Sequence, residues 1–324
     1  MATQKKKDVQ RVSKRSQTKK VKSRQTSKNK YEAIVQRLNP ISESKIVTEY
    51  KKLTQLSCKD VYGLSSHTRL GNSIVDYFTM VERLHTTGHK NISFYQFWEQ
   101  RKKYKKVPHI RKMLTFYNTR KIDEIRKFKY IYNLYFSSIT IFKPVLAMEI
   151  YCRVEAKRIL DFTMGWGGRL VGACALNLEA YIGIELNSHL QDPYKKMQSF
   201  LRQQNTTTKI DLRFQDALKI NYDLLDYDTV FTSPPYYDLE KYRGAKDGLD
   251  TKEKWFESFY KPIYEKTWNG LKSRGHYCLN VPQEIYEHTC IPVLGKCHQQ
   301  FLLKKKDRKE SAQYKEYIYV WKKP

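Results

Sequence analysis

The sequence lacks an apolar run long enough to cross a bilayer. Its longest apolar stretch, residues 130–142, is bounded by a lysine at each end. The N-terminus has no apolar segment of the kind found in secretory signals, so we expect no such signal. These absences argue against a membrane-spanning protein, and we expect no membrane partner.

Closely spaced cysteine pairs are also missing. The six cysteines are scattered, without a Cys-x-x-Cys pair: Cys58, Cys152, Cys174, Cys278, Cys290 and Cys297. The Cys297-His298 pair near Cys290 fits no standard zinc module, so we expect no metal site. Scattered cysteines are typical of a reducing, intracellular compartment, and the sequence leaves nucleus, cytoplasm and virion open.

Acidic residues are scarce. The 324 residues include 33 Asp and Glu against 61 Lys and Arg, which gives a net charge of +28. Such a balance favours a polyanionic partner, most often nucleic acid. Residues 1–30 alone hold 12 Lys and Arg and one Asp, and we expect them to form a disordered basic tail. This tail is either a phosphate-binding or nuclear-localisation segment or a solvated tail without a fixed partner.

Residues 31–139 are predicted to form a mainly helical region. Residues 31–38 have helical apolar spacing and end before Pro40, and Ser93 is a candidate cap for a helix through residues 94–106. Aromatic residues alternate with Lys and Arg from residue 94 onward, a mixture that suits a surface along a nucleic-acid backbone. Helical spacing also fits these aromatics to a core, so both interpretations stay open.

From about residue 140, short apolar strands alternate with helical patterns. The predicted strands are residues 158–161, 180–185, 210–216, 228–232 and 275–281, followed by a closing hairpin of residues 301–303 and 316–321. This alternation predicts an α/β domain over residues 140–324, with a mostly parallel, Rossmann-like sheet covered by helices on both faces.

Polar residues follow several predicted strands where each strand ends. Asp161 precedes a turn containing Gly165 and Gly167, Glu185 ends the second strand, and Asp216 ends the third. Glycines let a backbone approach a ligand closely, and parallel strands bind ligands at their carboxyl ends. An acid in the place of Glu185 suits the ribose hydroxyls of a nucleoside-like cofactor, although each residue alone also fits an ordinary cap or loop.

The fourth predicted strand ends in the motif Ser233-Pro234-Pro235-Tyr236. A side-chain oxygen and a backbone carbonyl can accept both hydrogens of an exocyclic amine on a nucleic-acid base and favour its methylation. The prolines fix the direction of that carbonyl, and the aromatic ring offers a face for an extruded base. The motif therefore predicts Ser233 and Pro234 as amine acceptors and Tyr236 as the stacking ring.

The glycine turn and the Pro-Pro motif together resemble the amino-methyltransferase branch of the class I S-adenosylmethionine-dependent methyltransferases. The similarity covers roughly residues 140–324 and includes DNA methylases of phages and large viruses. It implies S-adenosyl-L-methionine as cofactor, DNA as partner and base flipping. The residues it assigns to the cofactor are Phe142, Pro144, Asp161, Gly165, Trp166, Gly167, Glu185 and Asp216, with Glu185 at the ribose and Asp216 at the adenine.

Two departures from the family pattern affect the substrate. A serine before Pro-Pro, here Ser233, favours cytosine N4 over adenine N6. Only about fifteen residues separate the motif from the next helix, so no large target-recognition domain is inserted there. Target reading is then expected from the N-terminal half, from a partner subunit, or from the short loop with Tyr237, Lys241, Tyr242 and Arg243.

Two alternatives remain open at the level of sequence. Similar motifs serve RNA and tRNA base methyltransferases, and a catalytically silent methylase fold can act as a nucleic-acid-binding subunit. The turn lacks the Gly-x-Gly-x-x-Gly spacing of a dinucleotide-dependent dehydrogenase.

Overall fold

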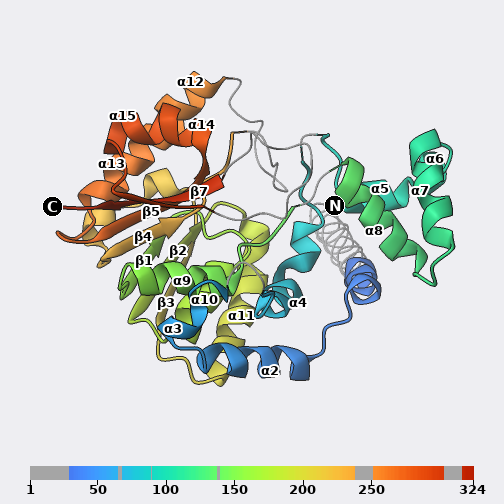
Figure 1. Cartoon of the computed structure of the whole chain (residues 1–324), viewed down its shortest axis with the longest axis horizontal. Helices are drawn as coiled ribbons and strands as arrows, with labels where there is room; N and C mark the ends of the chain where they lie inside the picture. The colour runs from blue at the N-terminus through green and yellow to red at the C-terminus, as the bar shows by residue number, and fades with distance from the viewer. Residues whose placement is uncertain (1–28, 65–67, 89, 137–138, 238–250, 303–315) are drawn as a thin grey trace, which may run out of the picture. The chain divides into compact units, whose positions relative to one another are not determined.

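The computed structural model describes residues 29–64, 68–88, 90–136, 139–237, 251–302 and 316–324 (Figure 1). The predicted basic tail lies outside these residues, apart from its last two positions. The chain divides into two compact units. One joins Arg101–Ile131 to the residues up to Pro40, and the other comprises Ile41–Gln100 and Tyr132–Pro324. Residues 41–100 therefore belong with the sheet, whereas the sequence places them in a separate helical region.

The larger unit is built on a seven-stranded sheet in the described part of the chain. In spatial order the strands are β3 (Lys209–Phe214), β2 (Ala180–Glu185), β1 (Arg158–Asp161), β4 (Thr229–Thr232), β5 (His276–Pro282), β7 (Glu316–Lys322) and β6 (Gln299–Leu302). β7 runs antiparallel to β5 and β6, and the other pairings are parallel. This confirms the predicted Rossmann-like α/β fold and its closing hairpin. The strand order reverses between β1 and β4, where open α/β sheets bind their ligands.

Alternate residues of each strand point to opposite faces, so neighbouring residues of β1 enter different cores. Ile159 packs on one face and Leu160 on the other. The first face is covered by α2 (Glu43–Thr54), α4 (Asn72–Arg83), α9 (Pro144–Arg153), α10 (Gly168–Ala175) and α11 (Gln191–Gln203). The second is covered by α13 (Lys261–Asn269), α14 (Gln283–Ile285) and two π-helical turns, Phe256–Tyr260 and Tyr286–Cys290 (Figure 1).

Shorter helical segments complete this unit. They are α3 (Cys58–Val61), α5 (Phe94–Glu99), α12 (Lys252–Trp255), α15 (Ile291–Leu294) and the 3₁₀ turns Ser188–Leu190, Ala217–Lys219 and Tyr222–Leu224. Among the described residues, no helix has both the length and the apolar character needed to cross a membrane.

Helix α5 shows how the aromatic residues of the N-terminal half are used. Ser93 caps the helix, because its hydroxyl accepts from the Gln96 N–H while the Gln96 side chain accepts from the Ser93 N–H. The side chains of Phe94, Phe97 and Trp98 are buried. Of the two interpretations that the sequence leaves open for these aromatics, the structure supports the core. The helix also ends at Glu99 instead of continuing to residue 106.

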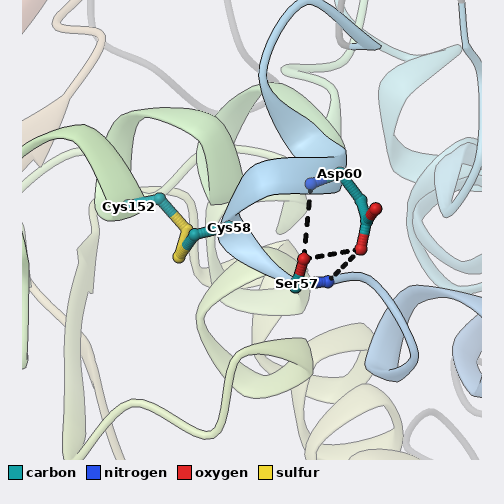
Figure 2. Close-up of a disulfide and its surroundings, with 4 residues drawn as sticks. All are labelled: Ser57, Cys58, Asp60 and Cys152. Carbon is teal, nitrogen blue, oxygen red and sulfur yellow. Dashed lines mark hydrogen bonds between the residues drawn. A yellow bond between two sulfur atoms is a disulfide. The ribbon is translucent and has the colours of Figure 1, made fainter.

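A disulfide joins Cys58 on α3 to Cys152 on α9, with the two Cα atoms 5.5 Å apart (Figure 2). At the start of α3, Ser57 and Asp60 form a capping box that fixes the helix beside the bond. Disulfides are rare in the reducing compartment that the scattered cysteines led us to expect. Cysteine usage therefore no longer supports a reducing compartment.

The smaller unit is helical. It contains a helix over residues 29–38, α6 (Arg101–Tyr104), α7 (Pro108–Asn118) and most of α8 (Glu124–Tyr135). Its buried side chains include Ile110, Ile125 and Phe128. The Arg37 guanidinium binds both carboxylate oxygens of Asp123, at 3.0 and 3.2 Å, which ties the first helix to the start of α8.

Candidate active site

A buried carboxylate links β1 to β4 where the strand order reverses. Asp161 has no exposed surface, and its two oxygens accept hydrogen bonds from three side chains. Arg169 donates at 2.6 and 3.1 Å, the Tyr181 hydroxyl at 2.6 Å and the Thr232 hydroxyl at 2.7 Å. Burial is the largest single influence on the pKa of Arg169 and lowers it. The charge of Asp161 and its hydrogen bonds, together with the neighbouring tyrosines, outweigh burial and raise this pKa above its ordinary value.

These bonds change the role expected for Asp161. Its oxygens serve partners within the protein and reach no solvent, so the geometry does not suit direct contact with a cofactor. Asp161 instead fixes Arg169 and Thr232, and the Arg169 Nη2 donates in turn to the Thr163 carbonyl at 2.6 Å. We therefore treat Asp161 as a residue that positions the loops on either side of the switch point.

The glycine turn after β1 has the conformation that its sequence predicts. Gly165 and Gly167 have φ values of +59° and +99°, in the region that favours glycine. A Cβ atom on Gly167 would lie 2.8 Å from the Met197 side chain. Tyr194, buried on α11, donates to the Gly165 carbonyl at 3.0 Å and so holds the turn in place.

Trp166 is only 7% exposed and belongs to the core beneath the turn. Its carbonyl accepts from the Thr79 hydroxyl at 3.3 Å, so α4 of the N-terminal segment contacts the turn. The sequence assigns Trp166 to the cofactor, and that contact stays a prediction; its side chain packs in the core.

The segment before α9 lies directly against the same turn. A Cβ atom on Gly168 would lie 1.8 Å from the Phe142 carbonyl oxygen, so only glycine fits there. The Phe142 ring faces the Arg169 guanidinium at 5.3 Å, and buried Pro144 begins α9. The structure thus places Phe142 and Pro144 beside the glycine turn, and their contact with a cofactor stays a prediction.

Glu185 lies half-buried at the end of β2 and faces the turn. Its carboxylate oxygens accept from the Gly165 N–H at 3.0 Å and from the Asn187 N–H at 2.8 Å. Burial raises the pKa of Glu185 to about 7, although the two N–H bonds lower it. Each oxygen keeps a second lone pair, so the ionised group has room for two further donors.

Asp216 comes two residues after β3, which ends at Phe214 and is shorter than predicted. Its Oδ1 accepts from the Leu218 N–H at 3.0 Å and caps the 3₁₀ turn that follows. The capping role explains the early end of the strand. A contact between Asp216 and an adenine ring stays a prediction.

The Ser-Pro-Pro-Tyr motif follows β4, and β5 holds its two hydroxyl groups. The Ser233 hydroxyl donates to the Asn280 carbonyl at 3.2 Å, and the Tyr236 hydroxyl donates to the same oxygen at 2.9 Å. The two hydroxyl oxygens lie 3.1 Å apart. Either hydroxyl can also donate to the other, and in both cases the Ser233 oxygen keeps a lone pair for another ligand.

Three other hydrogen bonds fix the backbone of the motif. The Thr163 hydroxyl donates to the Ser233 carbonyl at 3.2 Å, which connects the motif to the glycine turn. Tyr260, on the π-helical turn, donates to the Pro235 carbonyl and accepts from the Tyr237 N–H at 3.3 Å. The motif is therefore held from three directions: the β1 loop, β5 and the π-helical turn.

Tyr237 itself packs in an aromatic cluster. Its ring meets those of Tyr260 and Trp255 edge to face, with centroids 5.8 and 6.5 Å away. Burial raises the pKa of Tyr237 to about 12. The other loop residues expected to contact nucleic acid, Lys241, Tyr242 and Arg243, lie outside the described residues.

Sequence reasoning missed the residues that support the site. Tyr181, Thr232, Asn280 and Tyr260 are at least 20 positions along the chain from the groups they hold, and Arg169 is eight positions from Asp161. Only Arg169 carries a local signal, since it follows the glycines directly. Across the described residues, no group of three or more His, Cys, Asp or Glu side chains is placed to hold a metal ion.

No protein-family model and no curated protein matches the sequence. Among solved structures, the chain is similar to TrmN from Thermus thermophilus, with 16% identity and a TM-score of 0.39 over 56% of this chain and 49% of that one. It is similar to a SAM-dependent O-methyltransferase from Thermotoga maritima, with 16% identity and a TM-score of 0.39 over 57% and 67% of the two chains. It is also similar to an RNA methyltransferase from Salinibacter ruber in complex with S-adenosyl-L-homocysteine, with 12% identity and a TM-score of 0.34 over 57% and 94%.

This chain thus spans about half the length of the Thermus protein. At these low scores the likenesses bear on neither reaction nor substrate, and the fold rests on the strand order described above.

Proposed function

We propose that this protein is an S-adenosyl-L-methionine-dependent methyltransferase that modifies an exocyclic amino group of a DNA base. The observation that carries the proposal is the shared acceptor at Asn280. Both motif hydroxyls donate to it, at 3.2 and 2.9 Å, beside the strand-order reversal. This arrangement leaves the Ser233 oxygen free to accept an amine hydrogen.

The residues around the glycine turn fit the cofactor. The ionised Glu185 has lone pairs for the two ribose hydroxyls, and the positive-φ glycines let the backbone approach the methionine moiety. Asp216 lies just after strand β3, next to β2, where its carboxylate would accept a hydrogen bond from the adenine amino group of the cofactor. When bound, S-adenosyl-L-methionine supplies an electrophilic methyl group on a sulfonium sulfur.

The chain contributes alignment and hydrogen bonding. The Ser233 oxygen and the Pro234 carbonyl accept the two amine hydrogens, which localises the nitrogen lone pair that conjugation otherwise spreads into the ring. The Tyr236 ring, fixed through its hydroxyl at Asn280, stacks on the flipped base. The bound cofactor would supply the methyl group to this nitrogen, and the amine proton would then pass to solvent. No general base is needed, and positioning supplies most of the acceleration.

Cytosine N4 is our preferred target because a serine precedes Pro-Pro in this motif. The deciding experiment is nucleoside mass spectrometry of unmethylated duplex DNA incubated with the protein and the cofactor, with Ser233→Ala as the matched control. N4-methylcytosine supports the full proposal, and N6-methyladenine retains the enzyme class but overturns the base. Methylation of RNA and not of DNA overturns the substrate. Cofactor binding without methylation of either polymer contradicts the enzyme assignment.

A further inference from the structure

The smaller helical unit carries a concentrated positive charge. Residues 101–131 contain 12 Lys and Arg and two acidic residues. Both acidic residues form ion pairs with cations of the same unit. Asp123 pairs with Arg37 at 3.0 Å, and Glu124 pairs with Lys105 at 2.5 Å. Within residues 101–131 the cations therefore outnumber the acids by ten.

Several of these cations are exposed, and some of them belong to a stripe along α7. The exposed residues include Lys102, Lys103, Lys106, Arg111, Lys112, Arg120 and Lys121. On α7, Lys112 and Phe116 are four residues apart, and Arg120 follows four residues later, just beyond the helix. Side chains at this spacing lie on one face of a helix.

A row of aromatic rings continues from this stripe. Phe116 and Tyr130 are 51% and 46% exposed, which is unusual for large rings in a unit with its own core. The ring centroid of Tyr117 lies 5.4 Å from that of Phe116 and 5.6 Å from that of Tyr130. The Arg120 guanidinium stacks over Phe116 at 4.8 Å. Rings next to guanidinium groups are the combination that binds unpaired bases and their phosphates.

We propose that this basic-aromatic unit, residues 101–131, is a docking surface for DNA, separate from the catalytic site. The exposed cations bind backbone phosphates, and the row of Phe116, Tyr117 and Tyr130 stacks on unpaired bases. A charged surface that only faces solvent gains nothing from exposed aromatic rings beside its arginines. The choice of DNA rests on the proposed function, whereas the docking itself does not.

The test is DNA binding by the full chain without cofactor, measured by fluorescence anisotropy over a salt titration. The variant replaces Lys102, Lys103, Arg111 and Lys112 with Gln. The control removes the same charge from exposed positions of the larger unit: Lys51, Lys52, Lys195 and Lys196 to Gln. Each lost phosphate contact lowers the slope of log affinity against log salt by about 0.9. We expect a slope smaller by roughly 3 to 4 in the variant and little change in the control.

A second variant tests the rings without changing charge. Phe116→Ala is expected to weaken single-stranded DNA binding about tenfold and to affect duplex binding less. Equal losses in the docking and control variants, or no loss in either, overturn the proposal. Tighter binding to RNA than to DNA overturns the choice of polymer. Salt-sensitive docking without any methyl transfer retains this inference and contradicts the proposed function.

Discussion

At the scale of single residues, the site depends on a few side-chain hydrogen bonds. Ser233 and Tyr236 share one acceptor, the Asn280 carbonyl, and the Ser233 oxygen keeps a lone pair for another donor. Asp161 is saturated by Arg169, Tyr181 and Thr232 and orients the loops around it. The residues proposed to contact the substrate are thus different from those that hold the loops in place.

Replacing Ser233 by Ala removes one of the two amine acceptors. We expect turnover to fall on the order of 100-fold, the usual effect of losing one preorganised hydrogen bond in a transition state. Cofactor affinity should be unchanged by calorimetry, because the hydrogen bonds of the Ser233 side chain among the described residues go to Tyr236 and Asn280. Ser199→Ala, at an exposed position of α11, is the control. Full turnover in Ser233→Ala would contradict the assignment.

Glu185 makes cofactor binding depend on pH. Its pKa of about 7 lies above the ordinary value, so the group is ionised only above neutrality in the free protein. The ribose hydroxyls need the ionised form, so affinity should rise as the pH increases through 7 and weaken ~30-fold a unit and a half below it. Calorimetry at several pH values checks this. Glu185→Gln should bind weakly and lose this dependence, whereas Glu43→Gln on α2 should retain it.

The raised pKa of Glu185 also makes the folding stability depend on pH, in the direction opposite to cofactor affinity. Because the folded pKa lies above the unfolded one, the protonated form favours folding. The contribution is complete below the unfolded pKa and is lost as the pH rises through about 7. Added cofactor should oppose this loss, because it favours ionised Glu185.

At the scale of elements, the π-helical turn Phe256–Tyr260 acts as a clamp. Such turns interrupt a helix and are frequent at functional sites. This one brings the Tyr260 hydroxyl to the backbone on both sides of Tyr236, at Pro235 and Tyr237. The following helix, α13, belongs to the core beneath it.

Tyr260→Phe removes this clamp and retains the ring. We expect turnover to fall about tenfold, the effect of a net loss of one to two hydrogen bonds, with cofactor affinity unchanged. Tyr264→Phe is a close control, because the described partners of its hydroxyl are Cys290, whose sulfur lies 3.8 Å away, and Thr289, both outside the motif. Equal turnover in the two variants would show that the clamp has no role in positioning the motif.

The sequence predicted most of the sheet and only part of the site. β1 and β2 have the predicted bounds, because each is a short apolar run closed by an acid. β3 ends early because Asp216 caps a turn, and a capping acid and a strand-ending acid look alike in a sequence. Tyr260 and Asn280 were missed because their contacts join distant segments. The core role of Phe94 and Trp98 was undecided, because helical spacing fits a core and a surface equally well.

At the scale of the whole molecule, one covalent bond spans a large part of the chain. Cys58 and Cys152 are 94 positions apart, and the bond ties α3 to the helix that begins beside the glycine turn (Figure 2). Closing so long a loop restricts the unfolded chain more than the folded one.

Cys58→Ser should therefore lower the free energy of unfolding by roughly 2–4 kcal/mol. Denaturant unfolding under non-reducing conditions measures this. Cys297→Ser, which changes a cysteine outside the disulfide, should leave stability nearly unchanged. Equal stability of Cys58→Ser and the parent protein would mean that the bond does not form in solution.

The disulfide also changes what a protease can do to this protein. The whole basic-aromatic unit from Arg101 to Ile131 lies between the two bonded cysteines, so it is contained in a covalently closed loop. Trypsin prefers exposed lysines and arginines, which are abundant there. A single cut in that loop would yield two fragments that migrate as one species until a reducing agent is added. The protein can thus lose the continuity of its backbone and keep both halves together.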